Sequence, residues 1–329
     1  MNYGTAILEG FKYLLSNYPE TFVIGQGLWS PWYVGNTMSD LDKIFGKSRV
    51  IDTPVSESAC TSAAIGASLC GMRPIVVHPR MDFMLYAVDG IVNQAAKWNH
   101  MTGGQDSPKV TIRSIVNRGG QQGAQHSQSL HAWFAHIPGL RVVMPSTVQD
   151  ARDLLIASVL SNEPVIYIDD RWLYSNEETI PPINKDTKFN LSLVKPNITK
   201  KGNDITLVGN SFSHFLLNRA AEDLSEIGYS CEVIDLRIIN PLDESLIIES
   251  VSKTGRLLVV DGGWANCGLA SEIIARICLS DAREKLKCNP IRITLPDAPA
   301  PCSKVLEEIY YPDLNKVKEA IFLLIKNIN

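Results

Sequence analysis

A carboxylate stands where an apolar stretch gives way to a helical one, in the segment DTPVSE at 52–57. Glu57 precedes a run of small residues at 58–69 that predicts a helix, and negative charge is favoured at the first turn of a helix. The proline turn in front of it suits rigid presentation of the side chain. Glu57 is therefore either an ordinary helix-start carboxylate or a carboxyl group placed for general acid–base chemistry.

Two further stretches favour the second interpretation. One is Met81-Asp82-Phe83, and the other is a glycine-rich run at 118–128 that contains His126. Glycines in such a run permit positive φ and let the backbone approach a ligand closely. A histidine there can donate to a substrate carboxylate or move protons near neutral pH. The alternative for His126 is a loop histidine with an ordinary hydrogen-bond partner.

The elements that must position these residues follow an alternating pattern. In the first half we expect strands at 22–25, 50–52, 74–77, 110–116, 140–143 and 165–168, and helices near 3–18, 37–45, 57–70, 81–99 and 147–161. In the second half we expect strands near 205–208, 231–236, 257–260 and 291–294, and helices near 213–227, 243–252, 268–280 and 314–327. Such alternation predicts parallel sheets with helices on both faces, so the expected fold class is α/β with two doubly wound domains.

A polar stretch at 175–203 separates the two series. It carries Pro181, Pro182 and Pro196 and shows no clear hydrophobic period, which is typical of a connection between domains. The length of 329 residues also favours two domains over a single core. We expect a first domain at 1–189, with the linker beginning at about 175, and a second domain at 190–329.

Composition narrows the classes of partner and compartment. The net charge of −4 provides no basic surface for nucleic acid or for an anionic membrane. No stretch approaches the roughly 20 apolar residues of a spanning helix, and 1–15 predicts an amphipathic helix and not a signal peptide. The seven cysteines are scattered without a C-x-x-C pair, which favours reduced thiols in a cytoplasmic protein and no zinc site.

Six stretches carry a family resemblance. They are DTPVSES (52–58), GMRPIV (71–76), IVNQAAKW (91–98), GAQHSQSLHAWFAHIPGLRVVMPST (123–147), VIDLRIINPLD (233–243) and KTGRLLVV (253–260). In this order they resemble the β subunits of thiamine-diphosphate-dependent 2-oxoacid dehydrogenases of the pyruvate and branched-chain type, within the transketolase-like superfamily. The resemblance covers nearly the whole chain. It implies a pyrimidine-binding thiamine-diphosphate fold followed by a transketolase C-terminal-type domain.

The resemblance also implies roles for individual residues. In the family, a carboxyl group at the pyrimidine ring nitrogen shifts the cofactor's aminopyrimidine to its imino form, which removes a proton from the thiazolium ring. The matching residue is Glu57. Phe83 matches the aromatic residue that stacks on the aminopyrimidine, where a core Phe is the alternative. His126 matches a position facing the reacting centre, and Tyr86, one turn after Phe83, can line the same pocket.

The chain lacks the other half of such a cofactor site. The run at 118–128 has neither the Lys-Ser/Thr of a phosphate loop nor the downstream acid of a dinucleotide fingerprint. The segment DGGWAN at 261–266 differs in order and spacing from the family's Gly-Asp-Gly…Asn element for Mg²⁺ and diphosphate, and we predict a strand-end turn there. The resemblance therefore implies that an α subunit supplies the Mg²⁺ ligands in an α2β2 tetramer.

Three other features follow from the resemblance. The second domain is expected to make β–β contacts and to help dock a lipoyl-bearing acyltransferase core. A potassium ion is expected at carbonyls, and Ser161 stands where the family usually has an acidic residue. The matching positions for this ion are Val110, Ser158, Val159, Ser161 and Glu163.

The chain departs from the family pattern beside the expected stacking residue. The usual Glu-Phe-Met-Thr is replaced by Val77-His78-Pro79-Arg80, which removes a carboxylate and adds two basic groups. These basic groups either face an anionic substrate or rebuild a subunit interface, and the sequence leaves both interpretations open.

Three functions are compatible with these observations. The favoured one is the β subunit of a 2-oxoacid dehydrogenase, which decarboxylates a 2-oxoacid and passes the acyl group to lipoyl. The alternative is a two-subunit carboligase of transketolase type, which delivers a two-carbon unit to an aldehyde, ketone or sugar. The third is a non-catalytic scaffold, against which the joint presence of Glu57, Phe83 and His126 argues.

Overall fold

The computed structural model of the chain describes residues 1–30 and 32–326. Contacts divide the chain into two compact units, each built around one sheet. Unit 1 comprises Met1–Arg118 and Gln125–Val194, whereas unit 2 comprises Gly119–Ala124 and the chain from Lys195 onward. The sequence suggested a boundary near 190 and one uninterrupted first domain. In the structure the division follows Val194, and the loop 119–124 makes its contacts within unit 2.

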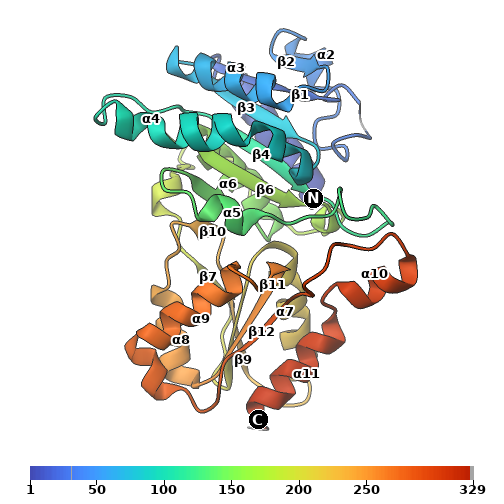
Figure 1. Cartoon of the computed structure of the whole chain (residues 1–329), viewed down its shortest axis with the longest axis vertical. Helices are drawn as coiled ribbons and strands as arrows, with labels where there is room; N and C mark the ends of the chain where they lie inside the picture. Colours follow the sequence, from blue (N-terminus) through green and yellow to red (C-terminus); the bar gives the residue numbers. More distant parts are fainter. Residues whose placement is uncertain (31, 327–329) are drawn as a thin grey trace. The chain divides into compact units, whose positions relative to one another are not determined.

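Unit 1 contains a parallel sheet with the strand order β5-β6-β4-β3-β1-β2 (Figure 1). Its strands are β1 (Thr21–Gln26), β2 (Val50–Thr53), β3 (Arg73–His78), β4 (Thr111–Val116), β5 (Arg141–Val143) and β6 (Val165–Asp170). Every residue of β4 and β6 is buried, which requires cover on both faces of the sheet. All six strands lie where the sequence predicted them.

Helices pack onto this sheet. They are α1 (Tyr3–Asn17), α2 (Leu41–Phe45), α3 (Glu57–Leu69), α4 (Ala96–Met101), α5 (His131–Ala135) and α6 (Val148–Leu160), with short turns η3 (Arg171–Leu173) and η4 (Leu191–Leu193). α3 contacts β1 and β3, α6 contacts β3 and β6, and α1 packs on α6. The helix expected at 37–45 begins only at Leu41, because Asn36 and Asp40 have left-handed φ values of 64° and 61°.

The helix expected at 81–99 has three parts. A 3₁₀ segment, η1 (Met81–Ala87), is followed by a π segment, η2 (Gly90–Ala95), and then by α4. Gly90 lies close to α3, where an added Cβ would stand 3.3 Å from the Ser62 hydroxyl. The irregular winding thus accompanies close packing of this segment on α3.

Unit 2 contains a sheet with the order β12-β11-β8-β9-β7, in which β7 alone is antiparallel to its neighbour. The strands of this sheet are β7 (Asn197–Lys200), β8 (Ile205–Gly209), β9 (Cys231–Asp235), β11 (Leu257–Trp264) and β12 (Ile291–Leu295), and the short strand β10 (Ile238–Asn240) is not part of it. Its helices are α7 (Ser211–Ser225), α8 (Ser245–Thr254), α9 (Leu269–Leu279), η5 (Asp281–Lys285), α10 (Lys304–Tyr310) and α11 (Leu314–Ile325).

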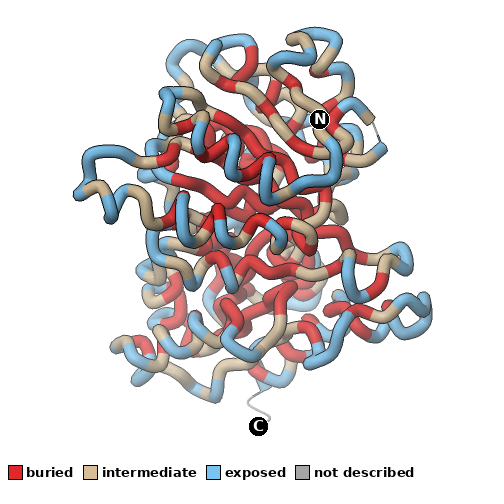
Figure 2. The backbone as a smooth tube through the Cα atoms, turned by 45° about the horizontal axis from the view of Figure 1, so that its top comes forward, coloured by how far each residue is buried: buried red, intermediate tan, exposed pale blue. Residues whose placement is uncertain are grey.

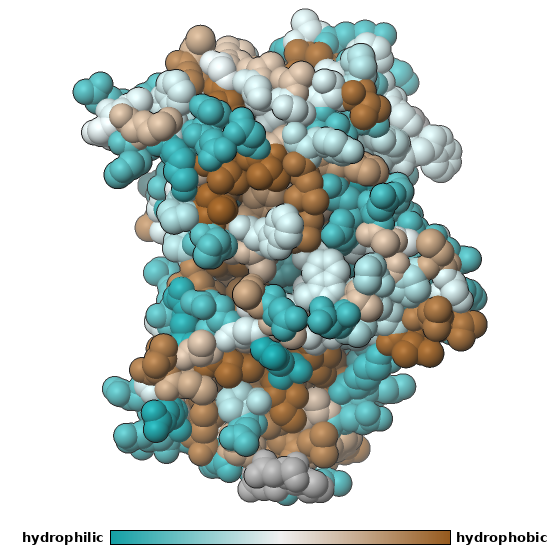
Figure 3. Space-filling view, in the orientation of Figure 1, coloured by the Kyte–Doolittle hydropathy of each residue, from teal (hydrophilic) through white to brown (hydrophobic). Residues whose placement is uncertain are grey.

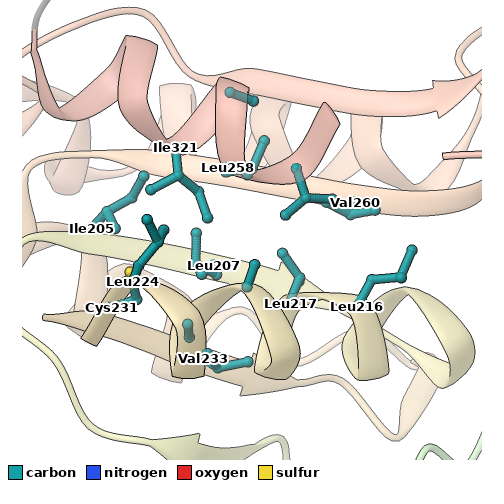
Figure 4. Close-up of a cluster of buried hydrophobic side chains, with 14 of the residues drawn as sticks. Ile205, Leu207, Leu216, Leu217, Leu224, Cys231, Val233, Leu258, Val260 and Ile321 are labelled. Atoms are coloured by element: carbon teal, nitrogen blue, oxygen red, sulfur yellow. The ribbon is translucent and has the colours of Figure 1, made fainter. Parts of the chain in front are cut away.

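The core of unit 2 lies where α7 and α11 cover β8, β9 and β11. Leu207, Leu217 and Ile321 belong to its cluster of buried side chains (Figure 4). Figure 2 shows burial along the backbone, with buried residues inside and exposed residues along the outer turns.

Unit 2 differs from the sequence predictions at three places. β7 lies inside the stretch expected to be an irregular connection, and the short helix α10 was not predicted. β11 continues through Trp264, so the turn predicted at 261–266 begins only at Ala265. β7 and α10 are too short for their hydrophobic pattern to predict them from sequence. Both elements depend on tertiary packing.

The surface of unit 2 has one apolar feature of note. α10 exposes Val305, Leu306 and Ile309, each more than half accessible, and an apolar group is visible over this helix in Figure 3. Among residues 1–30 and 32–326, no helix combines the length and the apolar character needed to cross a membrane.

Candidate active site

The candidate site lies at the carboxyl ends of the strands of unit 1, the edge where open α/β sheets bind ligands. β1 ends at Gln26 and β2 at Thr53, and the turn after β2 leads directly into α3, whose first residue is Glu57. Asp52 fixes the neighbouring turn, because its carboxylate accepts a hydrogen bond from the backbone N–H of Gly27 at 2.6 Å.

Glu57 is half-buried, and its carboxylate forms no hydrogen bond or ion pair with any residue that the structure describes. Glu57 lines an open cleft of about 600 Å³ and also a small pocket that contains His78. A partly desolvated carboxylate without a protein partner, at the wall of a cleft, is available to a ligand.

Segment η1 brings the two predicted aromatic residues to the same cleft as Glu57. Phe83 is half-buried, whereas Tyr86 is 74% exposed, so Phe83 belongs to the wall and Tyr86 to the rim. Gln26 also lines the cleft, and its amide donates a hydrogen bond to the hydroxyl of Tyr33. Sequence reasoning assigned no role to Gln26; its place at the end of a predicted strand was the available signal.

His126 lies against Phe83. The two rings meet edge to face, with centroids 5.3 Å apart and planes at 88°. Asp82 holds this arrangement together, because its Oδ1 accepts hydrogen bonds from the backbone N–H of Gln128 at 3.1 Å and from the Gln128 amide at 2.9 Å. Burial raises the pKa of Asp82, and the hydrogen bonds from Gln128 partly oppose this. Sequence reasoning quoted Asp82 without assigning it this positioning role.

The glycine-rich loop just before His126 is anchored within unit 2. The backbone N–H of Gln121 lies 3.2 and 3.1 Å from the two oxygens of Glu307, a buried residue of α10. Gly123 has a φ of 73°, and an added Cβ would stand 2.4 Å from the Cys302 sulfur. The loop therefore requires glycine at 123, and Glu307 is a residue that the sequence did not single out.

His78 is 2% exposed and lies in the small pocket beside Glu57. Its Nε2 is 3.2 Å from the Thr61 hydroxyl of α3, and burial lowers the pKa of His78 to about 4. A neutral buried imidazole cannot serve as the cation of a surface interface. His78 therefore supports neither of the two interpretations, a cation facing an anionic substrate or one at a subunit interface. Arg80 is the only added basic group to which they still apply.

Two protein-family models match the chain. The transketolase pyrimidine-binding domain matches residues 1–176, and the transketolase C-terminal domain matches residues 195–317. The chain is 35% identical over 317 residues to the human mitochondrial pyruvate dehydrogenase E1 component subunit beta, which covers 96% of this chain and 83% of the relative. It is 40% identical over 272 residues to the acetoin:2,6-dichlorophenolindophenol oxidoreductase subunit beta of Cupriavidus necator, which covers 83% and 79%.

The chain belongs to the family of 2-oxoacid dehydrogenase β subunits. Its fold is also that of a solved split-gene transketolase described as an inactive β4 tetramer, with a TM-score of 0.76, 20% identity, and coverage of 98% and 96%. The family, the two α/β domains of transketolase type and the class of thiamine-diphosphate-dependent enzyme components that the sequence predicted are confirmed.

The β-subunit residues fit the pyrimidine half of thiamine diphosphate. A carboxylate without a protein partner and an aromatic wall share one cleft, which suits a flat heterocycle with a basic ring nitrogen. The described residues contain no group of three His, Cys, Asp or Glu side chains that could hold a metal ion. The described residues therefore fit the pyrimidine ring of the cofactor, but they include no set of ligands for a metal ion.

A guanidinium lies at the carbonyls where the β-subunit family suggested potassium. Arg73 donates hydrogen bonds to the carbonyl oxygens of Val159 at 2.9 Å and Ser161 at 2.8 Å. The Val110 carbonyl accepts the backbone N–H of Val165, so it is engaged in the sheet. Two of the five expected ligands therefore already face a cation supplied by the chain itself. The Ser158 carbonyl accepts the backbone N–H of Ser161 at 3.2 Å, and the Glu163 carboxylate forms an ion pair with Arg141.

Proposed function

We propose that this chain is the β subunit of a heteromeric enzyme that decarboxylates a 2-oxoacid and transfers the acyl group to lipoyl. The proposal rests chiefly on one observation, the shared cleft of Glu57 and Phe83 with His126 against the Phe83 ring. Family membership supports it, as do two relatives named as β subunits of pyruvate dehydrogenase E1 and of an acetoin oxidoreductase.

When bound, thiamine diphosphate would supply the nucleophilic carbon that the decarboxylation of a 2-oxoacid requires. Glu57 would exchange a proton with the pyrimidine ring nitrogen, because its half-buried carboxyl group lines the cleft without a protein partner. Phe83 would fix the tilt of the ring by stacking, worth about 0.5–1.5 kcal/mol beyond burial of its area. His126, whose ring meets that of Phe83 edge to face, would donate a hydrogen bond to the substrate.

The proposal includes an α subunit that supplies the Mg²⁺ ligands in an α2β2 tetramer, with β–β contacts and docking to a lipoyl-bearing core. Two side chains that line the cleft support a covering partner, because Val55 and Tyr86 are 70% and 74% exposed. Exposed apolar groups that cluster around a polar site mark interaction surfaces. The cytoplasmic location expected from the sequence stays a prediction.

The test is to express the chain with candidate α chains encoded beside it and to analyse the products. The proposal predicts co-purification, Mg²⁺-dependent binding of thiamine diphosphate, and acetyl transfer to lipoamide with pyruvate or a related 2-oxoacid. Failure of any neighbouring chain to associate, together with failure to bind the cofactor, would instead favour the scaffold.

A second candidate is the two-subunit carboligase, which would pass the same two-carbon unit to an aldehyde, ketone or sugar. The specific observation in its favour is Arg80, a half-buried cation added beside the expected stacking residue. The same preparation incubated with pyruvate and an aldehyde separates the two functions. A hydroxyketone product with no acetyl-lipoamide would select the carboligase.

A further inference from the structure

Four arginines of unit 1 lie within β4 or just after β3, β4 and β6, and they fall into two classes. Arg113 is held by Asp169 through two hydrogen bonds of 2.8 Å, and Arg118 forms an ion pair with Asp170. Arg80 and Arg171 are paired with no carboxylate among the described residues. A half-buried guanidinium without a counter-ion is costly, because partial burial weakens its solvation.

The partners of Arg171 are all neutral. Its Nη1 donates to the Asn117 side-chain oxygen at 2.9 Å, and its Nη2 donates to the carbonyl oxygens of Trp32 and Tyr33 at 3.3 and 3.2 Å. Arg80 has still less, since its Nη1 donates to the Pro79 carbonyl at 3.2 Å and its buried Nε has no partner.

One buried side chain holds the two guanidinium groups in a common frame. Asn117, 1% exposed, accepts from Arg171 and donates to the Pro79 carbonyl at 3.0 Å, which is the same oxygen that accepts from Arg80. Each cation thus lies one hydrogen bond from the Asn117–Pro79 pair. Mutual repulsion adds to burial in lowering the pKa of Arg80, and the carboxyl group of Asp82 acts in the opposite direction without forming an ion pair.

This pair of cations adjoins the cleft described above. Pro79 lines the small pocket beside Glu57, and the carbonyl oxygen of Arg80 accepts the backbone N–H of Phe83 at 3.2 Å. Tyr33 links Arg171 to the cleft. Its carbonyl oxygen accepts a hydrogen bond from Arg171, and its hydroxyl accepts one from Gln26, which lines the cleft.

We propose that Arg80 and Arg171 form an anion subsite for a phosphate group of a substrate whose carbonyl end reaches the cleft. Two guanidinium groups match the charge of a phosphate monoester, which carries about −1.5 to −2 at pH 7. Their forked donors suit its oxygens, and a single carboxylate would leave one cation without a counter-charge. This assignment goes beyond the decarboxylation of a 2-oxoacid by naming a phosphate-bearing carbonyl compound as the acceptor, and it rests on the second candidate function only for the chemistry at the carbonyl end.

The experiment titrates ribose 5-phosphate, ribose and pyruvate separately into the full chain by calorimetry, without cofactor. We expect binding of ribose 5-phosphate and none of ribose. Loss of one charge-assisted contact should lower the affinity for ribose 5-phosphate by about tenfold or more in Arg80→Gln, and likewise in Arg171→Gln. Arg80→Lys should recover part of the affinity. Arg219→Gln is the matched control, because Arg219 is an exposed arginine with its own partner, Glu222. The affinity of this variant for ribose 5-phosphate should equal that of the wild type.

Several results would overturn the assignment. These are no binding of ribose 5-phosphate, equal binding of ribose, equal affinity in wild type and Arg80→Gln, or an Arg80→Gln effect confined to pyruvate, which would assign the subsite to a carboxylate. Because Arg171→Gln also removes contacts to the 32–33 backbone, Arg80→Gln decides if the Arg171 variant fails to fold. Binding of thiamine diphosphate, measured separately with a partner chain, shows whether the proposed function fails independently.

Discussion

At the scale of single residues, the site combines groups that the sequence could indicate with groups that it could not. Glu57 was indicated by a strand, a proline turn and a helix start, and these local signals hold in the structure. His78 was visible only as a departure from a family pattern. That it lies buried against Thr61 depends on the packing of β3 beneath α3, which no local pattern encodes.

The buried His78 predicts a pH-dependent stability. Its pKa of about 4 in the folded chain is below the value near 6.5 of an exposed histidine, so the unfolded chain binds the extra proton first as pH falls. Stability from this residue is complete above pH 6.5 and is lost between pH 6.5 and pH 4, by roughly 3 kcal/mol.

Denaturant unfolding of wild type and His78→Gln at pH 7 and pH 4 measures this contribution. We expect the loss on acidification to be smaller in the variant. His136→Gln, which changes a surface histidine, is the control and should behave as wild type does. Identical pH dependence in His78→Gln and wild type would show that the imidazole is not confined as described.

At the scale of elements, strands and long helices were predictable, whereas the irregular segments that carry function were less so. β4 and β6 are continuous apolar runs, the usual signature of a strand buried on both faces. Segment η1 was expected as ordinary helix, yet its 3₁₀ winding carries Phe83 and Tyr86. The anchoring of the glycine loop on α10 depends on residues far apart in sequence, and no periodicity reports such a pair.

Glu307 should control the mobility of the loop 119–124. Its buried carboxylate is the acceptor for the Gln121 N–H, and removing the charge should cost about 1–3 kcal/mol locally. In Glu307→Gln we expect about tenfold or faster hydrogen exchange of the peptide covering 118–128. Glu308→Gln, the exposed neighbour, is the matched control, and equal exchange in both variants would remove this role from Glu307.

Potassium should have little influence on this chain. Arg73 already places a guanidinium at the carbonyls of Val159 and Ser161, so a second cation there would meet repulsion. We expect the same melting temperature in potassium and in choline chloride, and a lower one in Arg73→Met because buried carbonyls lose their donors. A rise in melting temperature of the wild type that is specific to potassium would restore the ion site that the resemblance suggested.

At the scale of the whole molecule, each of the two α/β units carries a different part of the candidate site. Unit 1 carries the candidate cofactor cleft, and unit 2 holds the loop 119–124 that leads into His126. The class of both units could be predicted from alternation of strands and helices. That 119–124 makes its contacts within unit 2 could not, because it is set by the long-range contact with Glu307.

The central claim is that the Glu57 carboxyl group acts on the pyrimidine ring of a cofactor whose charged tail another subunit holds. The most direct test is the exchange of the thiazolium C2 proton of bound thiamine diphosphate for deuterium, measured in wild type and Glu57→Gln with the associated partner. We predict that exchange slows by about 10²-fold or more in the variant, with cofactor still bound and the melting temperature little changed. Exchange at the wild-type rate in cofactor-bound Glu57→Gln would contradict the account.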